Sequence, residues 1–208
     1  MSIFFTVAIL HLFAVASPGP DFVLVSRQCL RYGRKVALWT SLGIAIGILF
    51  HVSLSITGLS ILLQNQPGLF WYLKLLASAY IGYLGIISLF SKNSTQFKEF
   101  KASRIKDELK SITTGFLTNV LNPKALIFFI TVFTLVITQE TSITLKSLLG
   151  VYMSFATFIW FALMSILLTN KGATIKFKKA IPWIEKVTGL LLLIIAIQIL
   201  LQEDLIFS

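Results

Sequence analysis

Two residues of opposite charge stand out because each follows a proline inside a long apolar stretch. Asp21 comes after Pro20, and Lys124 comes after Pro123. An ionisable side chain at the centre of a lipid bilayer costs roughly 2.5–3.5 kcal/mol on insertion scales, so two of them need a partner or a function. They could satisfy each other, and a small zwitterion could replace that pairing. We therefore expect the carboxylate to bind an ammonium group and the lysine to bind a carboxylate.

The residues around each charge are ones that interrupt a helix. Pro18, Gly19 and Pro20 precede the aspartate, and Pro123 precedes the lysine. Proline removes a backbone donor and clashes with the preceding turn, and glycine adds backbone freedom. Each interruption starts a half-helix whose first N–H groups carry the positive end of the helix dipole. Two interrupted segments in matching places predict a binding site between them.

Other roles for these residues stay open at this point. Asp21 could cap the half-helix that it begins, and Lys124 could reach the membrane surface along its aliphatic stem. The same two residues could carry protons. Asn119 and Asn122, three apart on one helical face, could hydrogen-bond a substrate or only repair the backbone around Pro123.

The composition fits a bilayer as the solvent. The 208 residues are 56% hydrophobic and 12% charged, and apolar runs of roughly 20 residues, enough to cross the hydrocarbon layer, recur along the chain. We predict an all-α integral membrane protein with six transmembrane helices, of which the first and fourth are broken at their prolines. The predicted spans are Ile3–Leu30, Val36–Leu63, Phe70–Phe90, Ile112–Thr138, Ser147–Thr169 and Pro182–Leu201.

Basic residues gather in alternate loops, which predicts the orientation of the spans. The loops after the first, third and fifth spans hold most of them, so these loops are expected on the cytoplasmic side and both termini outside. The loop after the third span could also contact anionic lipid. The residues are Arg27, Arg31, Arg34 and Lys35 after the first span, Lys92, Lys98, Lys101, Arg104, Lys106 and Lys110 after the third, and Lys171, Lys176, Lys178 and Lys179 after the fifth.

Six spans divide into three and three, and two homologous halves with an odd number of spans would be inverted relative to each other. Pro20 then corresponds to Pro123 and Gly47 to Gly150, and one common spacing relates both pairs. The expected single transmembrane domain, residues 1–208, consists of one repeat (1–90), a cytoplasmic connector (91–111) and a second repeat (112–208).

Small residues in the predicted helices favour close helix packing. In the second span, glycines and His51 recur every four residues on one face, where the histidine is either a proton carrier or a hydrogen-bonded interfacial residue. The glycines expected to pack are Gly43, Gly47, Gly82, Gly85 and Gly150.

Several function classes find no support in the sequence. The net charge of +10 lies in short loops and acts as a topology signal, so no nucleic-acid partner is expected. One cysteine, Cys29, cannot form an internal disulfide or a two-thiol relay. The two histidines, His11 and His51, are isolated, so neither a metal site nor a catalytic constellation is expected, and no phosphate loop is found. Transport would then be secondary, without a cofactor.

With these motifs the chain resembles the LysE/RhtB family of amino-acid exporters. The resemblance rests on SPGPDFVLVSRQCLRYGRK (17–35), GIAIGILFH (43–51), LKLLASAYIGYLGI (73–86) and GFLTNVLNPKALIFF (115–129), which cover both halves. It implies a bacterial inner-membrane exporter of neutral or basic amino acids or related metabolites, exchange of substrate for protons or another coupling ion, and a homodimer.

Two other functions compete with amino-acid efflux. One is export of a different small metabolite. The other is a membrane scaffold or assembly protein without transport activity, which would tolerate replacement of both Asp21 and Lys124.

Overall fold

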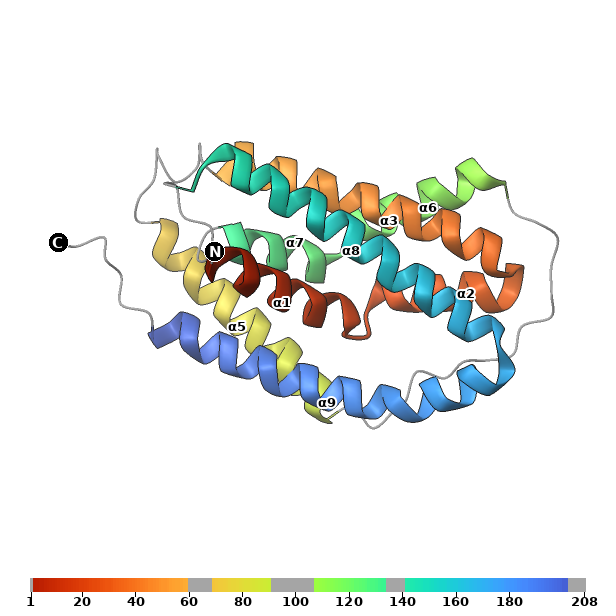
Figure 1. Cartoon of the computed structure of the whole chain (residues 1–208). Coiled ribbons are helices and arrows are strands. Elements are labelled where there is room, and N and C mark those ends of the chain that lie inside the picture. Colours follow the sequence, from red (N-terminus) through yellow and green to blue (C-terminus); the bar gives the residue numbers. More distant parts are fainter. Residues whose placement is uncertain (1, 60–68, 91–106, 134–140, 202–208) are drawn as a thin grey trace.

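The computed structural model describes residues 2–59, 69–90, 107–133 and 141–201, and the regular structure in these ranges is helical throughout. The expected all-α class is therefore confirmed for this part of the chain. Figure 1 shows an elongated bundle. Its elements are α1 (Ser2–Ala16), α2 (Pro20–Tyr32), α3 (Arg34–Leu54), a short π-helix η1 (Ser55–Leu59), α5 (Leu69–Phe90), α6 (Glu108–Val120), α7 (Pro123–Thr131), α8 (Ile143–Thr169) and α9 (Lys171–Leu201).

Within the described residues, two helices are long and apolar enough to cross a membrane, namely α3 continued to Gly58 and α8. A third span results if the bent pair α1 and α2 counts as one. The six inverted spans stay a prediction, although each predicted span overlaps a described helix or helix pair. Most of the predicted connector, residues 91–106, lies outside the described residues.

The first predicted span is broken at its proline motif. The α1 helix ends at Ala16, α2 begins at Pro20, and their axes are bent by 53°. Gly19 before the new helix is extended (φ −167°, ψ −171°), and Pro20 occupies the first helical position, where a missing N–H costs nothing. The break places Asp21 in the first turn of α2.

A second break separates α6 from α7. The Asn122 side chain accepts a hydrogen bond from the backbone N–H of Lys124 at 3.0 Å and so caps the new helix. Pro123 again occupies the first helical position. Both charged residues therefore stand directly after the opening proline of a half-helix.

Close helix contacts hold the bundle together. The α3 helix packs on α6 and α8, and α5 packs on α9 along the opposite edge (Figure 1). A Cβ at Gly43 would collide with the backbone of Ile112, and one at Gly85 would lie 2.9 Å from the Gly189 carbonyl. At Gly82 a Cβ would meet only Ala196, at 3.6 Å. Helix backbones can approach this closely only where side chains are absent.

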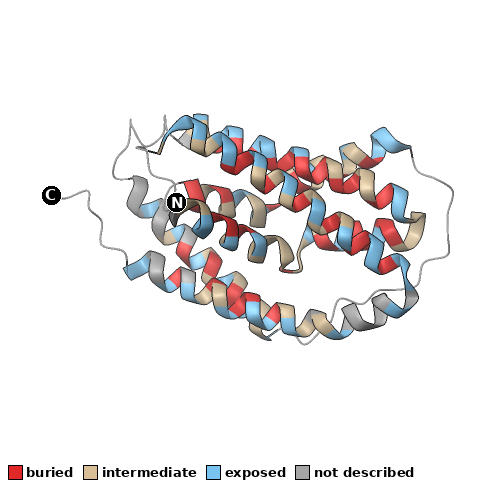
Figure 2. Cartoon of the chain, in the orientation of Figure 1, coloured by how far each residue is buried: buried red, intermediate tan, exposed pale blue. Residues whose placement is uncertain are grey.

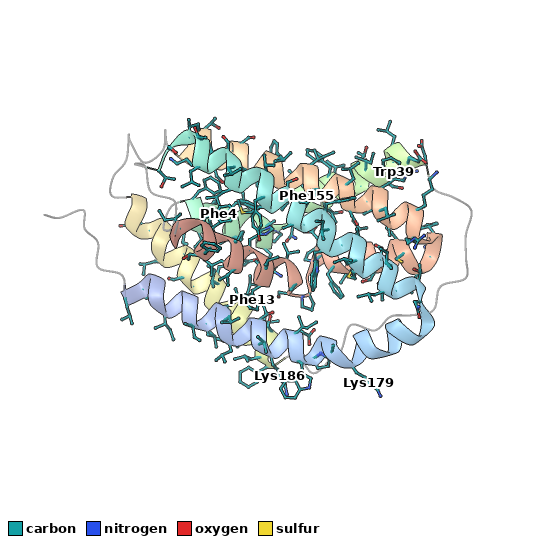
Figure 3. All side chains as sticks on the ribbon, viewed as in Figure 1. Phe4, Phe13, Trp39, Phe155, Lys179 and Lys186 are labelled. Carbon is teal, nitrogen blue, oxygen red and sulfur yellow. The ribbon has the colours of Figure 1, made fainter. Side chains whose placement is uncertain are left out.

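The outer surface of the bundle is apolar. Buried residues face the interior of the bundle in Figure 2, and large hydrophobic side chains such as Leu76, Phe155 and Trp183 point outward with more than half of their surface exposed. Figure 3 shows Phe155 on the outside of α8, and Lys179 and Lys186 on α9. An extensive apolar surface of this kind suits lipid as the surrounding medium.

Candidate functional site

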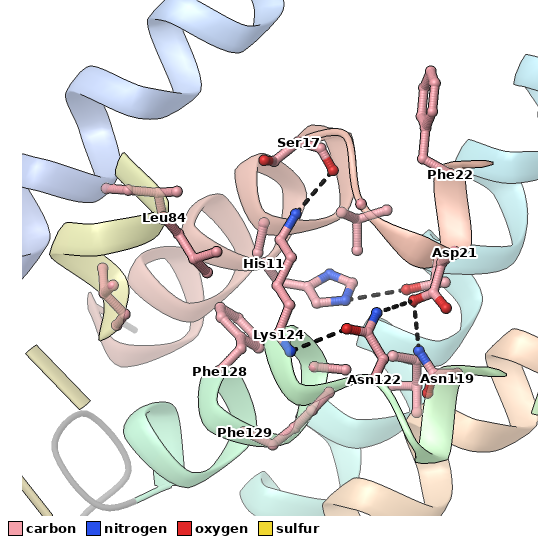
Figure 4. A pocket seen from close by; sticks show the side chains of 18 of the residues that line it. His11, Ser17, Asp21, Phe22, Leu84, Asn119, Asn122, Lys124, Phe128 and Phe129 are labelled. Carbon is pink, nitrogen blue, oxygen red and sulfur yellow. Dashed lines mark hydrogen bonds between the residues drawn. The ribbon is translucent and has the colours of Figure 1, made fainter. Parts of the chain in front are cut away.

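A cavity of about 60 Å³ lies where the two breaks meet (Figure 4). Its lining includes Ser17, Gly19 and Asp21 from the first break and Asn122 and Lys124 from the second. Of the site residues predicted at the two interruptions, Asn119 also lines this space, whereas the prolines Pro18, Pro20 and Pro123 do not. Aromatic side chains from α5, α7 and α8 supply much of the remaining wall: Tyr80, Phe128, Phe129 and Phe161.

Asp21 is held by two amide side chains from the second break. Its Oδ2 accepts from Asn119 Nδ2 at 2.9 Å and from Asn122 Nδ2 at 3.1 Å (Figure 4). The other carboxylate oxygen, Oδ1, is buried and has no hydrogen-bond partner. A buried carboxylate oxygen without a donor is costly. This atom is therefore the natural acceptor for a bound ammonium group.

Lys124 reaches back to the first break. Its Nζ donates to the Ser17 carbonyl oxygen at 2.8 Å (Figure 4). This carbonyl follows the end of α1, where the helix dipole is negative. The contact compensates the lysine for its unfavourable place in the first turn of α7. The described residues contain no direct ion pair between Lys124 and Asp21, so each charged group has its own hydrogen-bond partners.

The start of α2 lies beside Lys124, and no side chain at its N-cap position accepts a hydrogen bond from the N–H groups of the first turn of α2. Gly19 supplies no capping side chain, and a Cβ built on it would lie 3.4 Å from Lys124 Cδ and 3.5 Å from Lys124 Nζ. An ammonium group has three donors, and the bond to Ser17 uses one. The helix N-terminus and the ammonium therefore border the same space, which has the chemistry to hold a carboxylate.

The two asparagines serve the protein's own structure and the site at once. Asn122 caps α7 through Oδ1 and binds Asp21 through Nδ2. Asn119 is 1% exposed, and a Cβ on Gly47 would lie 2.6 Å from its Oδ1. Gly47 thus leaves the room that the Asn119 amide occupies while it holds Asp21.

His51 stands behind this network and does not line the cavity. The ring is 1% exposed, its Nε2 lies 3.1 Å from the Asn119 carbonyl oxygen, and it stacks on Phe129 at 5.4 Å between centroids. The ring is hydrogen-bonded, but it lies inside the bundle and not at an exposed end. Its ring connects through Asn119 to Asp21.

Some site residues were not among the predicted ones. The Ser17 carbonyl is a backbone group, so no side-chain type in the sequence identifies it. His11 lines the cavity with Thr157, to which it is hydrogen-bonded. In the sequence His11 is an isolated histidine, and nothing around it indicates this contact. The glycines at 43, 82, 85 and 150 do not line the cavity. Among the described residues, no group of three His, Cys, Asp or Glu side chains could hold a metal ion.

Comparison with known proteins gives a consistent result. Residues 12–203 match the family described as LysE type translocator. An uncharacterised membrane protein of Haemophilus influenzae is 30% identical over 188 residues, which cover 89% of this chain and 90% of that protein. The threonine efflux protein of Salmonella typhimurium is 28% identical, and that of Escherichia coli K12 is 27% identical, each over 92% of this chain and 94% of the relative. No solved structure matches the chain.

Proposed function

This chain belongs to the LysE type translocator family, and from that premise we propose that it exports small amino acids across the cytoplasmic membrane of a bacterium by secondary transport. The observation that carries the proposal is the pair of opposite charges at one cavity, each with unused hydrogen-bonding capacity. Relatives named threonine efflux proteins support a small amino acid as the substrate.

Both charged groups of an amino acid find a partner in this arrangement. The substrate ammonium binds Asp21 Oδ1, which is buried without a donor. The substrate carboxylate binds Lys124 Nζ and the uncapped N–H groups at the start of α2. The substrate then joins two separately held charges and does not have to break an ion pair between them.

The cavity also limits substrate size. A buried water needs about 10–15 Å³ of comparable space, so a cavity of about 60 Å³ holds only several waters. Amino acids with short side chains, of the threonine or homoserine kind, therefore fit this space better than longer ones do.

Proton exchange can use the same carboxylate. A protonated Asp21 no longer attracts an ammonium, so proton binding from outside would release the substrate there. His51 reaches this carboxylate through the Asn119 backbone and side chain. We include Asp21 and His51 as the proton-coupling residues of the proposal.

The orientation in the membrane belongs to the same proposal. The α2–α3 junction, the start of α6 and the α8–α9 junction lie at one end of the bundle, and the start of α1 lies at the other (Figure 1). The end with the three junctions carries the basic loops and is then cytoplasmic, with both termini outside and repeats 1–90 and 112–208 inverted relative to each other. A homodimer is included on the basis of the resemblance alone.

The decisive test is transport by the purified protein. Proteoliposomes should show counterflow of labelled threonine, homoserine or leucine, and an imposed pH gradient should accelerate net flux. Empty liposomes are the control. Absence of flux for every amino acid, together with a normally folded protein, would contradict the proposal and favour the scaffold; flux of only another metabolite would favour that alternative.

Orientation can be tested because Cys29 is buried. In a Cys29→Ser background, a cysteine placed at Lys179 should react with an impermeant thiol reagent only from the cytoplasmic side. A cysteine at Ser142 should react only from outside. Labelling of both from one side would contradict the inverted arrangement.

A further inference from the structure

A second polar group lines the cavity besides the charged pair. His11 from α1 and Thr157 from α8 are each 1% exposed, and His11 Nε2 lies 3.1 Å from Thr157 Oγ1 (Figure 4). Both residues line the cavity. They are far apart in sequence, and the proposed transport of charged groups gives them no role.

One nitrogen of this histidine has no partner. Nδ1 of His11 is buried without a hydrogen bond. The ring lies among aromatic side chains, with centroids 6.0 Å from Phe128 and 6.4 Å from Tyr152. A buried polar atom left unpaired costs free energy in such surroundings. Since the residue lines the cavity, a substrate group can remove this cost.

The chemistry of the free nitrogen selects the kind of group. If Thr157 donates to Nε2, Nδ1 carries the proton and is a donor; if Nε2 donates to Thr157, Nδ1 is an acceptor. A carboxylate suits only the first state, and an ammonium only the second. A hydroxyl suits both, because it donates and accepts.

We propose that His11, held in place by Thr157, selects substrates whose short side chain carries a hydroxyl. The inference rests on the proposed function and specifies the substrate class of the same cavity. Asp21 and Lys124 hold the groups that all amino acids share, and His11 reads the side chain. Thr157 is a positioning residue, because it acts through the imidazole.

The test compares substrates that differ only in the hydroxyl. Threonine and valine have the same shape, as do homoserine and norvaline. We expect the wild-type protein in proteoliposomes to prefer the hydroxylated member of each pair by at least about tenfold, the effect of one hydrogen bond to a buried polar group. His11→Phe and Thr157→Val should lower this ratio toward one.

Thr40→Val is the matched control. Thr40 is a buried threonine on α3 that donates to the Val36 carbonyl at 2.9 Å and does not line the cavity. This variant should keep the wild-type ratio. Thr157→Val preserves side-chain shape, so it tests the inference even if His11→Phe fails to fold.

The outcomes separate the two proposals. Equal flux of threonine and valine in the wild-type protein, or a ratio that both variants leave unchanged, would overturn the role of His11 while amino-acid export stands. No flux of any amino acid would instead contradict the proposed function itself.

Discussion

At both breaks a proline opens a half-helix and a charged residue follows it, yet the first turns of the two half-helices are satisfied differently. The N–H groups of α7 meet a side-chain cap from Asn122, whereas Gly19 leaves those of α2 without one. Asp21 carries the charge that the start of a helix favours, and Lys124 carries the opposite one. The second break is thus capped by a protein side chain, and the first is not.

The difference shows that similar motifs in two halves need not have equivalent roles. Lys124 is stabilised by the Ser17 carbonyl of the other half, and Asp21 by amides of the other half. Each break therefore depends on the opposite one, which is how two half-helix starts can produce one asymmetric site for an asymmetric ligand.

The largest effect is expected from removing the charge at either break. Asp21→Asn and Lys124→Met keep side-chain size but remove one partner of the bound zwitterion. Loss of a buried charged hydrogen bond costs about 2–5 kcal/mol, so efflux should fall at least about thirtyfold in each variant. Initial rates in proteoliposomes measure this.

Lys179→Met, on an exposed residue of α9, is the control for losing a positive charge and should retain the wild-type rate. Wild-type efflux in one of the two site variants would mean that the corresponding break does not bind a charged group. Wild-type efflux in both variants would favour the alternative of a membrane scaffold.

A smaller difference is expected between the matching glycines of the two halves. In Gly47→Ala the new Cβ would lie 2.6 Å from Asn119 Oδ1, so the amide that holds Asp21 must move. Efflux should drop about tenfold with the loss of this hydrogen bond. In Gly150→Ala the Cβ meets Val52 Cγ1 at 2.6 Å, away from the cavity.

The Gly150 variant should therefore lower the unfolding temperature while its efflux rate stays within about twofold of wild type, because the overpacking it causes costs stability rather than binding. Rates normalised to reconstituted protein and thermal unfolding in detergent separate the two effects. Equal loss of transport in both variants would remove the distinction between the halves.

The open start of α2 can be closed by substitution. Gly19→Ser supplies a hydroxyl oxygen that can accept a hydrogen bond from an N–H group in the first turn of α2, where the substrate carboxylate is proposed to bind. We expect KM to rise several-fold and the unfolding free energy to change by only a few tenths of a kcal/mol. A KM equal to that of the wild-type protein would show that these N–H groups do not contact the substrate.

The smallest effect is expected at an exposed pair of charges far from both breaks. Lys35 and Glu108 form an ion pair of 2.6 Å between α3 and α6, and this hydrogen-bonded contact lowers the pKa of Glu108. Its stabilisation is present above the ordinary pKa of a glutamate and is lost as the pH falls through the lowered value.

Glu108→Gln should therefore change the unfolding temperature slightly at pH 7, and the difference from wild type should shrink at acidic pH. Efflux should be unaffected. A large loss of efflux in Glu108→Gln at either pH would mean that this exposed pair matters as much as the buried charges, which contradicts the comparison.

The sequence predicts the positions of the breaks well because proline acts locally. Pro20 and Pro123 determine where α2 and α7 begin whatever surrounds them. Charge type also predicts that Asp21 and Lys124 need polar partners. Local rules of this kind give the helices and the residues that meet at the cavity.

The partners themselves could not be predicted in the same way. A direct pairing of the two charges was one expectation, but the nearest acceptor for Lys124 is the Ser17 carbonyl, and a backbone group has no signature in the sequence. The burial of His51 and the contact of His11 with Thr157 depend on which helix faces meet across the bundle. Such contacts between distant segments are set by tertiary packing.

The Asn122 amide has a mechanical consequence. Its oxygen fixes the first turn of α7 and its nitrogen holds the Asp21 carboxylate, so one planar group joins that carboxylate to the start of α7. A displacement of that carboxylate must therefore either stretch one of these hydrogen bonds or move the start of α7 with it. The Asn122 amide thus couples any movement of the Asp21 carboxylate to the orientation of α7.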